Sequence, residues 1–198
     1  MAELVRFRDL WNRVRAGDAQ AATDLVRQFE PLIRHEVRLR MTDPRLTRAF
    51  DSADVCQSVL ASFFARAACG QFDLRGPDDL VCLLLTMARN KLASKARRLR
   101  ARPADDRIEE GVDVQDLISG PASDDPSRIA LGRDLVEQVR RHLGLEERRI
   151  AELRGEGTTW DEVAAALGGT AEGRRKQLAR GLGRATRALG LDDEDLDG

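Results

Sequence analysis

Residues 157–170, GTTWDEVAAALGGT, decide the architecture of the second half of the chain. Thr159 is followed three residues later by Glu162, which forms a capping box and predicts the start of a helix. Gly168 permits a sharp turn after that short helix, and Thr170 can cap the next one. A short helix, a glycine turn and a longer basic helix are the pattern of a helix-turn-helix, which we expect over residues 159–189.

The longer helix expected over residues 171–189 has an apolar face and a basic face. Spacings of four, three and four residues separate Leu178, Leu182, Ala185 and Leu189. Roughly opposite them lie Lys176, Arg180, Arg184 and Arg187. Such a helix can pack by its apolar face and enter a major groove with the other. A plain amphipathic helix with a solvated basic face is the alternative, and the preceding turn favours DNA binding.

The composition predicts an all-α fold. The 198 residues are 34% charged and only 4% aromatic, and Tyr is absent. Ala, Leu, Arg, Glu and Asp dominate, and most of these are good helix formers. Dense charge with few aromatic residues indicates small units with thin cores. We therefore expect two small helical domains joined by a flexible acidic linker.

Apolar spacing, caps and turn residues place the helices along the chain. They are expected over residues 3–16, 18–41, 52–69, 78–102, 126–143, 146–154, 159–167 and 171–189. Pro31 lies inside the second of these patterns and should kink or interrupt it. The resulting divisions are a first domain over 1–102, an acidic linker over 103–124, a second domain over 125–190 and an acidic tail over 191–198.

The net charge of −1 hides two basic segments on either side of an acidic one. Residues 84–102 contain basic side chains and no acid, and residues 170–190 contain six basic residues against Glu172 alone. Residues 103–134 are predominantly acidic. This distribution points to a nucleic-acid partner where the total charge does not.

Several other classes of protein are excluded or disfavoured. No segment approaches the roughly 20 apolar residues of a membrane span, and the start has no signal-peptide core, so we expect a cytoplasmic protein without a membrane partner. Cys56, Cys69 and Cys82 lack paired spacing, and His35 and His142 are the only histidines, so buried apolar roles are favoured over a metal site. Without a nucleophile–base pattern or a phosphate-binding loop, we expect neither an enzyme nor a cofactor.

The motifs together resemble the sigma-70 family. Residues 162–168, EVAAALG, followed by Thr170, Leu178 and Arg180, resemble region four, which binds the minus-35 promoter element. Residues 51–59, DSADVCQSV, resemble region 2.2, and residues 84–92, LLTMARNKL, resemble regions 2.3 and 2.4. Residues 10–18, LWNRVRAGD, are similar to the usual start of extracytoplasmic-function (ECF) members, and regions one and three have no room. The wording is similar to ECF proteins common in planctomycetes.

The resemblance implies a sigma factor that binds core RNA polymerase, through its clamp coiled coil and flap, and promoter DNA. Its polymerase contacts would be Asp51, Asp54 and Gln57, although helix capping by Asp51 and a wet helix face also explain them. Minus-35 contacts would come from Thr170, Arg175, Lys176, Gln177, Arg180 and Arg184. A loop holding a flipped base would use Gln71, Phe72 and Asp73, and a core plug is an equal alternative for Phe72.

Minus-10 contacts would come from Arg89, Asn90, Lys91, Lys95, Arg98 and Arg102. The last four lysines and arginines of this set share one helical face at spacings of four, three and four, which suits phosphate contact. Arg89 and Asn90 are better placed to touch bases. A solvated basic stripe is the alternative.

Three features depart from the family pattern. Arg174 stands where an apolar residue is usual, so its stem should lie along the core while its charge reaches solvent. Leu83 stands where many ECF proteins have Trp. Gly181 and Gly183 should each weaken the recognition helix by about 1 kcal/mol relative to Ala.

Two rivals to the sigma reading stay open. One is a helix-turn-helix regulator that binds duplex DNA without polymerase, and the other is a sigma-like decoy that sequesters polymerase or an anti-sigma partner. Promoter-specific run-off transcription separates them, because only a sigma factor initiates. The sequence leaves open whether an anti-sigma factor exists, and whether the acidic tail shields the recognition helix or serves solubility.

Overall fold

The computed structural model describes residues 2–101 and 126–192, which form nine helices and no strand. The all-α prediction is thus confirmed for these residues, whereas the expected linker over 103–124 lies outside them. The helices are α1 (Ala2–Arg15), α2 (Ala19–Arg40), α3 (Pro44–Ala49), α4 (Ser52–Ala68), α5 (Pro77–Ala101), α7 (Pro126–Arg141), α8 (Leu145–Gly155), α9 (Trp160–Leu167) and α10 (Ala171–Ala188). The eight predicted helices all form, with ends shifted by no more than two residues.

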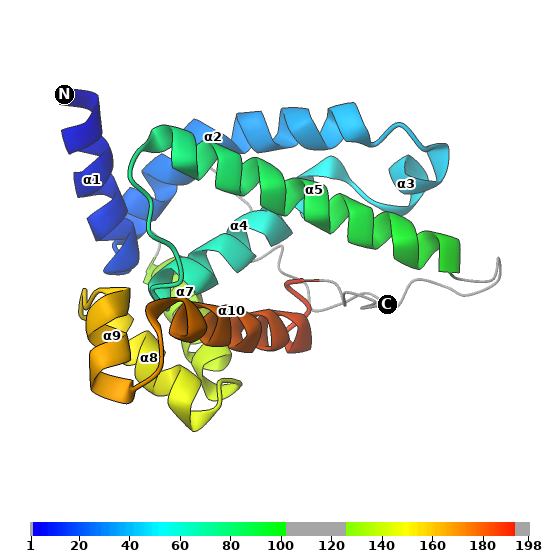
Figure 1. Ribbon diagram of the computed structural model, residues 1–198. Coiled ribbons are helices and arrows are strands. Elements are labelled where there is room, and N and C mark those ends of the chain that lie inside the picture. Colours follow the sequence, from blue (N-terminus) through cyan, green and yellow to red (C-terminus); the bar gives the residue numbers. More distant parts are fainter. Residues whose placement is uncertain (1, 102–125, 193–198) are drawn as a thin grey trace.

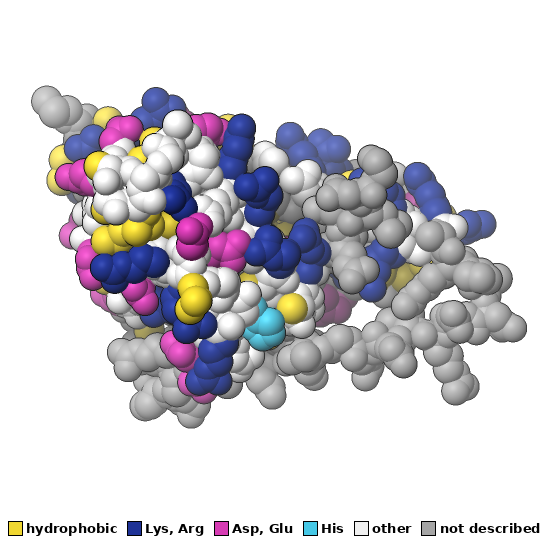
Figure 2. All heavy atoms as spheres, turned by 60° about the horizontal axis from the view of Figure 1, so that its bottom comes forward, with side chains coloured by type: hydrophobic (Ala, Val, Ile, Leu, Met, Phe, Trp, Pro, Cys, Tyr) yellow, Lys and Arg dark blue, Asp and Glu magenta, His cyan; other side chains and the backbone are white. Residues whose placement is uncertain are grey.

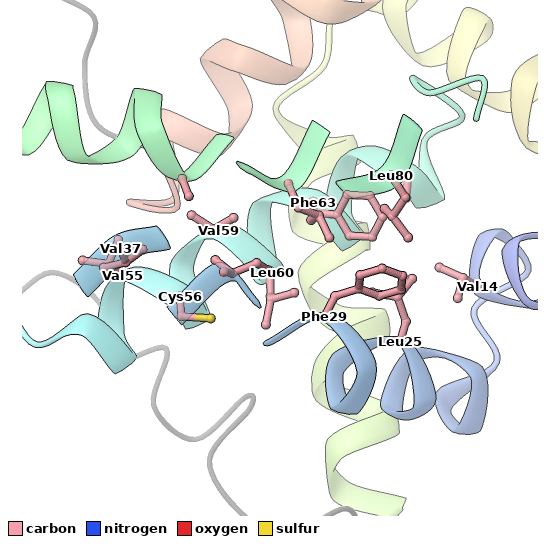
Figure 3. Close-up of a cluster of buried hydrophobic side chains, with 14 of the residues drawn as sticks. Val14, Leu25, Phe29, Val37, Val55, Cys56, Val59, Leu60, Phe63 and Leu80 are labelled. Atoms are coloured by element: carbon pink, nitrogen blue, oxygen red, sulfur yellow. The ribbon is translucent and has the colours of Figure 1, made fainter. Parts of the chain in front are cut away.

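Helices α1 to α5 form a first unit around one apolar core. Helices α2, α4 and α5 contact one another, and α1 lies across α2 and α4 (Figure 1). Figure 3 shows side chains from these helices converging on the centre of the unit. The core includes Trp11, Leu25, Phe29, Ile33, Val55, Leu60, Phe63, Leu80 and Leu84. These residues recur at helical spacing along each element, and that periodicity made the unit predictable.

Helices α7 to α10 form a second unit below α4 in the view of Figure 1. Its core includes Val139, Leu143, Ile150, Val163, Leu178, Leu182 and Ala185. Leu191, which the sequence assigns to the acidic tail, is also buried in this core. The second unit thus extends beyond residue 190.

Helix α4 belongs to both cores. Val55, Leu60 and Phe63 face the first unit, whereas the second core includes three small residues spaced four apart: Ala61, Ala65 and Cys69. A helix that is apolar on all sides must be covered on all sides. The two units therefore share α4 as their contact surface.

Two local predictions about the first unit need correction. Helix α2 continues through Pro31 without interruption. The segment after α2, expected only to close that helix, forms the short helix α3. Asp43 caps it by accepting from the Arg45 backbone N–H at 2.9 Å, and Pro44 occupies its first turn. Proline suits the first turn of a helix, so the Asp-Pro pair starts a helix here instead of ending one.

Candidate nucleic-acid interface

The predicted helix-turn-helix is built as its sequence indicates. Thr159 and Glu162 form the capping box at the start of α9: the Thr159 N–H donates to the Glu162 carboxylate at 2.8 Å. Gly168 ends α9 with φ of +77°, a backbone conformation that glycine adopts without strain. Thr170 caps α10 through its hydroxyl, which accepts from the Gly173 N–H at 3.0 Å. The capping box and the turn are confirmed.

Helix α10 presents its polar side chains on the face away from its core residues. Arg175, Lys176 and Arg180 are exposed. Glu172 pairs with Arg175 at 2.7 Å and with Lys176 at 3.4 Å. Gln177 donates to the Glu146 carboxylate at 2.7 Å. Figure 2 views the molecule from the side of the second unit, and Lys and Arg side chains are spread over this face among Asp and Glu.

Arg174 caps the preceding helix. Its Nε donates to the Gly168 carbonyl at 2.9 Å, and a second guanidinium N–H donates to the Leu167 carbonyl. The side chain is only 15% exposed and also pairs with Glu146 at 3.2 Å. The last carbonyls of a helix lack internal partners and favour a cation. The predicted snorkelling to solvent is therefore replaced by a contact that fastens α9 to α10.

Gly181 has a packing role that its helix propensity does not reveal. A Cβ built on Gly181 would lie 2.5 Å from the Glu147 Cδ. Glu147 is buried, accepts from the Gly144 N–H at 2.9 Å at the start of α8, and pairs with Arg184 at 2.5 Å. Glycine is thus needed where α10 crosses α8, and the propensity cost expected at this position is the cost of that close approach.

On α5, part of the predicted basic face is exposed and part is not. Arg89, Asn90 and Arg98 are exposed, and Arg102 lies outside the described residues. Arg89 pairs with Glu36 of α2 at 2.8 Å. Hydrogen bonds from Arg40 and then Arg89 hold the pKa of Glu36 below its ordinary value. The first basic residue of this face is therefore anchored to α2.

Lys95 and Lys91 have more specific surroundings. The Lys95 ammonium lies 4.0 Å from the centroid of the Phe50 ring, in cation–π contact. Lys91 is buried, and its ammonium donates to the carbonyl of Leu191, the residue after the end of α10. The predicted face of four basic residues is thus interrupted, because a segment distant in sequence covers one of them.

The loop between α4 and α5 packs on the first core at one end and contacts the second unit at the other. Phe72 stacks on Phe63 with ring centroids 5.8 Å apart. Gln71 accepts from Arg66 at 3.3 Å. The Asp73 carboxylate pairs with Arg154 of α8. In this arrangement Phe72 is partly buried against the core, which is the alternative that the sequence left open.

A cavity of about 500 Å³ lies between α4, α5 and this loop. Its lining combines an aromatic ring, an amide and several cations, and includes Phe72, Asn90, Lys91, Arg97 and Arg187. Unpaired bases are recognised by stacking on aromatic side chains and by hydrogen bonds to their edges. The chemistry of the cavity therefore suits an unstacked nucleotide.

The residues assigned to polymerase binding lie at the start of α4. Asp51 caps the helix by accepting from the Ala53 N–H at 3.0 Å, and this bond is the main reason why the pKa of Asp51 is lowered. Asp51 and Asp54 are exposed, and Gln57 is half-buried. Asp51 thus acts as a cap, while Asp54 leaves an exposed acid one turn further along.

The cysteines are not all buried, as the sequence suggested. Cys56 and Cys69 are buried, but Cys82 is exposed. No cluster of His, Cys, Asp or Glu suited to a metal occurs within residues 2–101 and 126–192. Burial raises the pKa of the Cys56 thiol to about 12 and also raises that of Cys69.

We expect Ellman's reagent at pH 8 to react rapidly with Cys82 alone in the folded chain. Only thiolate reacts, and the raised pKa of Cys56 leaves about one molecule in 10,000 ionised at that pH. In denaturant all three thiols should react. Cys82→Ser should remove the fast phase, and rapid reaction of a second thiol in the folded chain would contradict the assigned burial.

Sequence reasoning missed two residues that join the units. Arg154 is 3% exposed and donates to the Gly70 carbonyl at 3.0 Å as well as to Asp73. Asp192 pairs with Arg66 of α4 at 2.6 Å. The motif Leu189-Gly190-Leu191 carried a signal, since a glycine after a helix followed by an apolar residue indicates a packed helix cap. No local signal distinguished Arg154 from a surface arginine.

A model of the family described as ECF sigma factor matches residues 5–188. No curated protein and no solved structure matches the chain. Among the helices of the described residues, none is long and apolar enough to cross a membrane.

Proposed function

The chain belongs to the ECF sigma factor family, and from this premise we propose that it binds core RNA polymerase, recognises the minus-10 and minus-35 promoter elements and promotes opening of the DNA. The family is one of non-enzymatic initiation factors. The observation that carries the proposal is the match over nearly the whole chain, together with two basic helices, α5 and α10, on separate units.

In this proposal α10 enters the major groove at the minus-35 element. Thr170 and Arg175 at its start, with Lys176 and Gln177, reach bases or the adjacent phosphates. Arg180 and Arg184 contact the backbone. The hydrogen bonds that Arg174 donates to the end of α9 support this role, because they fix the angle between the two helices of the motif.

The first unit acts on the minus-10 element. Lys95 and Arg98 of α5 contact phosphates, with Lys91 and Arg102 continuing the same face. Arg89 and Asn90 lie at the start of the run, where base edges are read. The cavity beside Phe72 takes an unpaired base, with Gln71 and Asp73 at its edge. Binding to unpaired DNA supplies the free energy of opening, because nothing in this scheme hydrolyses a nucleotide.

Run-off transcription with purified core polymerase tests the proposal. The chain should initiate from its own promoters, which transcriptome mapping after overexpression would identify. A regulator that works without polymerase contact would not replace sigma, and a decoy would inhibit. Failure to initiate with cognate core enzyme on mapped promoters would refute the proposed function.

Asp54→Arg should weaken binding to core polymerase by about tenfold or more. Asp54 is exposed at the start of α4 and would meet a basic polymerase surface, so reversal replaces attraction by repulsion. Titration of a fluorescently labelled chain with core enzyme measures the affinity. Asp9→Arg is the matched control, since Asp9 is exposed on α1. Unchanged affinity of the Asp54 variant would remove this residue from the interface.

A further inference from the structure

The turn after α10, residues 190–192, is a built element of the fold. Gly190 has φ of +69°, and its N–H donates to the Arg187 carbonyl at 2.9 Å. The Leu191 N–H donates to the Thr186 carbonyl at 2.8 Å, which completes a Schellman motif. Leu191 is 1% exposed. The cap therefore turns the chain back between the two units (Figure 1).

The carbonyl of Leu191 is held by two helices of the first unit. The Ser58 hydroxyl on α4 donates to it at 2.8 Å, and the Lys91 ammonium on α5 donates to it as well. Lys91 is only 6% exposed. A side chain on the proposed minus-10 face is thus engaged by the turn after α10.

The carboxylate of Asp192 completes the contact. Oδ2 accepts from Arg66 at 2.6 Å, from Ser62 at 3.0 Å and from Thr186 at 2.7 Å. Burial by itself would raise the pKa of Asp192, but the Arg66 charge, the Thr186 hydroxyl and the Arg66 hydrogen bond bring it below its ordinary value. A half-buried carboxylate with three donors from α4 and α10 joins the units specifically.

A second polar contact joins the units at the loop between α4 and α5. The Arg154 guanidinium donates to the Gly70 carbonyl at 3.0 Å, to the Thr158 carbonyl at 2.7 Å and to the Asp73 carboxylate. The Arg154 carbonyl in turn accepts from Arg15 of α1 at 2.6 Å. A Cβ on Gly70 would lie 2.4 Å from the Arg154 Cβ, so only glycine allows this approach.

The apolar part of the contact on α4 consists of small side chains. Ala61, Ala65 and Cys69 are the α4 members of the second core. Because the free energy of apolar burial scales with area, three small residues contribute less to holding the units together than large ones would. The polar contacts at Asp192 and Arg154 therefore decide whether the units stay joined.

We propose that this arrangement is a closed, inhibited state, in which the turn after α10 and Arg154 mask the minus-10 surface until polymerase separates the units. This inference rests on the proposed function, because it takes Lys91 and Asp73 as parts of the DNA site. Lys91 cannot give the same donor to the Leu191 carbonyl and to a phosphate. Asp73 cannot read a base edge while it pairs with Arg154.

Thiol labelling tests the closed state without polymerase or DNA. Cys69 lies in the contact between α4 and the second unit, whereas Cys56 lies inside the first core. In a Cys82→Ser background, Asp192→Ala should raise the labelling rate of Cys69 about tenfold, and Cys56 should stay unreactive, as expected if the first core stays intact. Arg66→Met, which breaks the same ion pair from the other side, should act in the same direction.

Asp161→Ala is the matched control for the labelling experiment, because Asp161 is an exposed acid on α9. It should leave the rate at Cys69 unchanged. Circular dichroism checks that each variant keeps its helices. If Asp192→Ala and Arg66→Met both leave Cys69 as protected as in the parent, the turn does not hold the units together and the inference is overturned.

The inhibitory role is tested by run-off transcription at limiting core polymerase. Asp192→Ala should give several-fold more transcript than the parent, because less of the polymerase binding energy is needed to open the chain. Faster labelling of Cys69 without increased initiation would overturn the inhibitory role. Absence of initiation from the parent itself would refute the proposed function, and the labelling result would then describe only how the units are joined.

Discussion

A chain in which Lys95 and Arg98 are both replaced by glutamate is expected to bind core RNA polymerase but to initiate no measurable transcription. The change turns two positive charges on α5 into two negative ones, on the face proposed to contact the minus-10 phosphates. Losing two phosphate contacts and adding repulsion should lower promoter affinity by about 100-fold or more. Lys95 also loses its contact with the Phe50 ring, which contributes about 1 kcal/mol or less at such a site.

Run-off transcription and polymerase titration, performed on the same preparation, separate loss of DNA contact from loss of the fold. Arg6→Glu together with Arg8→Glu is the matched control, since both arginines are exposed on α1. This control should keep initiation. Retained initiation by the Lys95 and Arg98 variant would contradict the DNA face assigned to α5.

Neutral replacements sharpen the same prediction. Lys95→Gln with Arg98→Gln removes the charges without adding repulsion. The slope of log affinity for promoter DNA against log salt should then become shallower by about 2, one for each phosphate contact. An unchanged slope, measured by holoenzyme binding over a salt series, would place these two side chains away from the backbone.

Local sequence patterns predicted most of the fold because each helix carries its own periodicity and caps. The Thr159 and Glu162 capping box and the Gly168 turn depend only on neighbouring residues, so the structure repeats them. The helix α3 was missed although its signal was also local. Asp43 followed by Pro44 is a helix start, but its position directly after α2 made it read as a stop.

The candidate site was less predictable because contacts between distant segments decide it. Helical spacing placed Lys91 on one face with Lys95 and Arg98, which is correct for α5 alone. The carbonyl of Leu191, 100 residues further along the chain, then buries Lys91. Gly181 likewise reads as a weak helix position until Glu147 of α8 is seen against it.

The shared use of α4 links the folding of the chain to its proposed function. Its large residues build the first core, and its small residues receive the second unit. Arg66 on the same helix binds both Gln71 in the loop and Asp192 after α10. A change on α4 therefore acts at once on stability, on the loop beside the cavity and on the contact between units.

Phe63→Ala should be the most destabilising single change in the first unit, lowering the free energy of unfolding by about 3–5 kcal/mol. Phe63 is fully buried on α4, with ring centroids 6.0 Å from Trp11, 5.3 Å from Phe64 and 5.8 Å from Phe72. Removing its ring leaves a cavity that these three rings line.

The change should also release the loop that carries Phe72, since its stacking partner is lost. Urea unfolding followed by circular dichroism measures the stability, and Phe63→Leu is the matched control because it keeps most of the apolar volume without the ring. The leucine variant should lose clearly less stability than the alanine variant. A loss below about 1 kcal/mol for alanine would mean that the site collapses around the missing ring, and that Phe72 owes its position to the rest of the core.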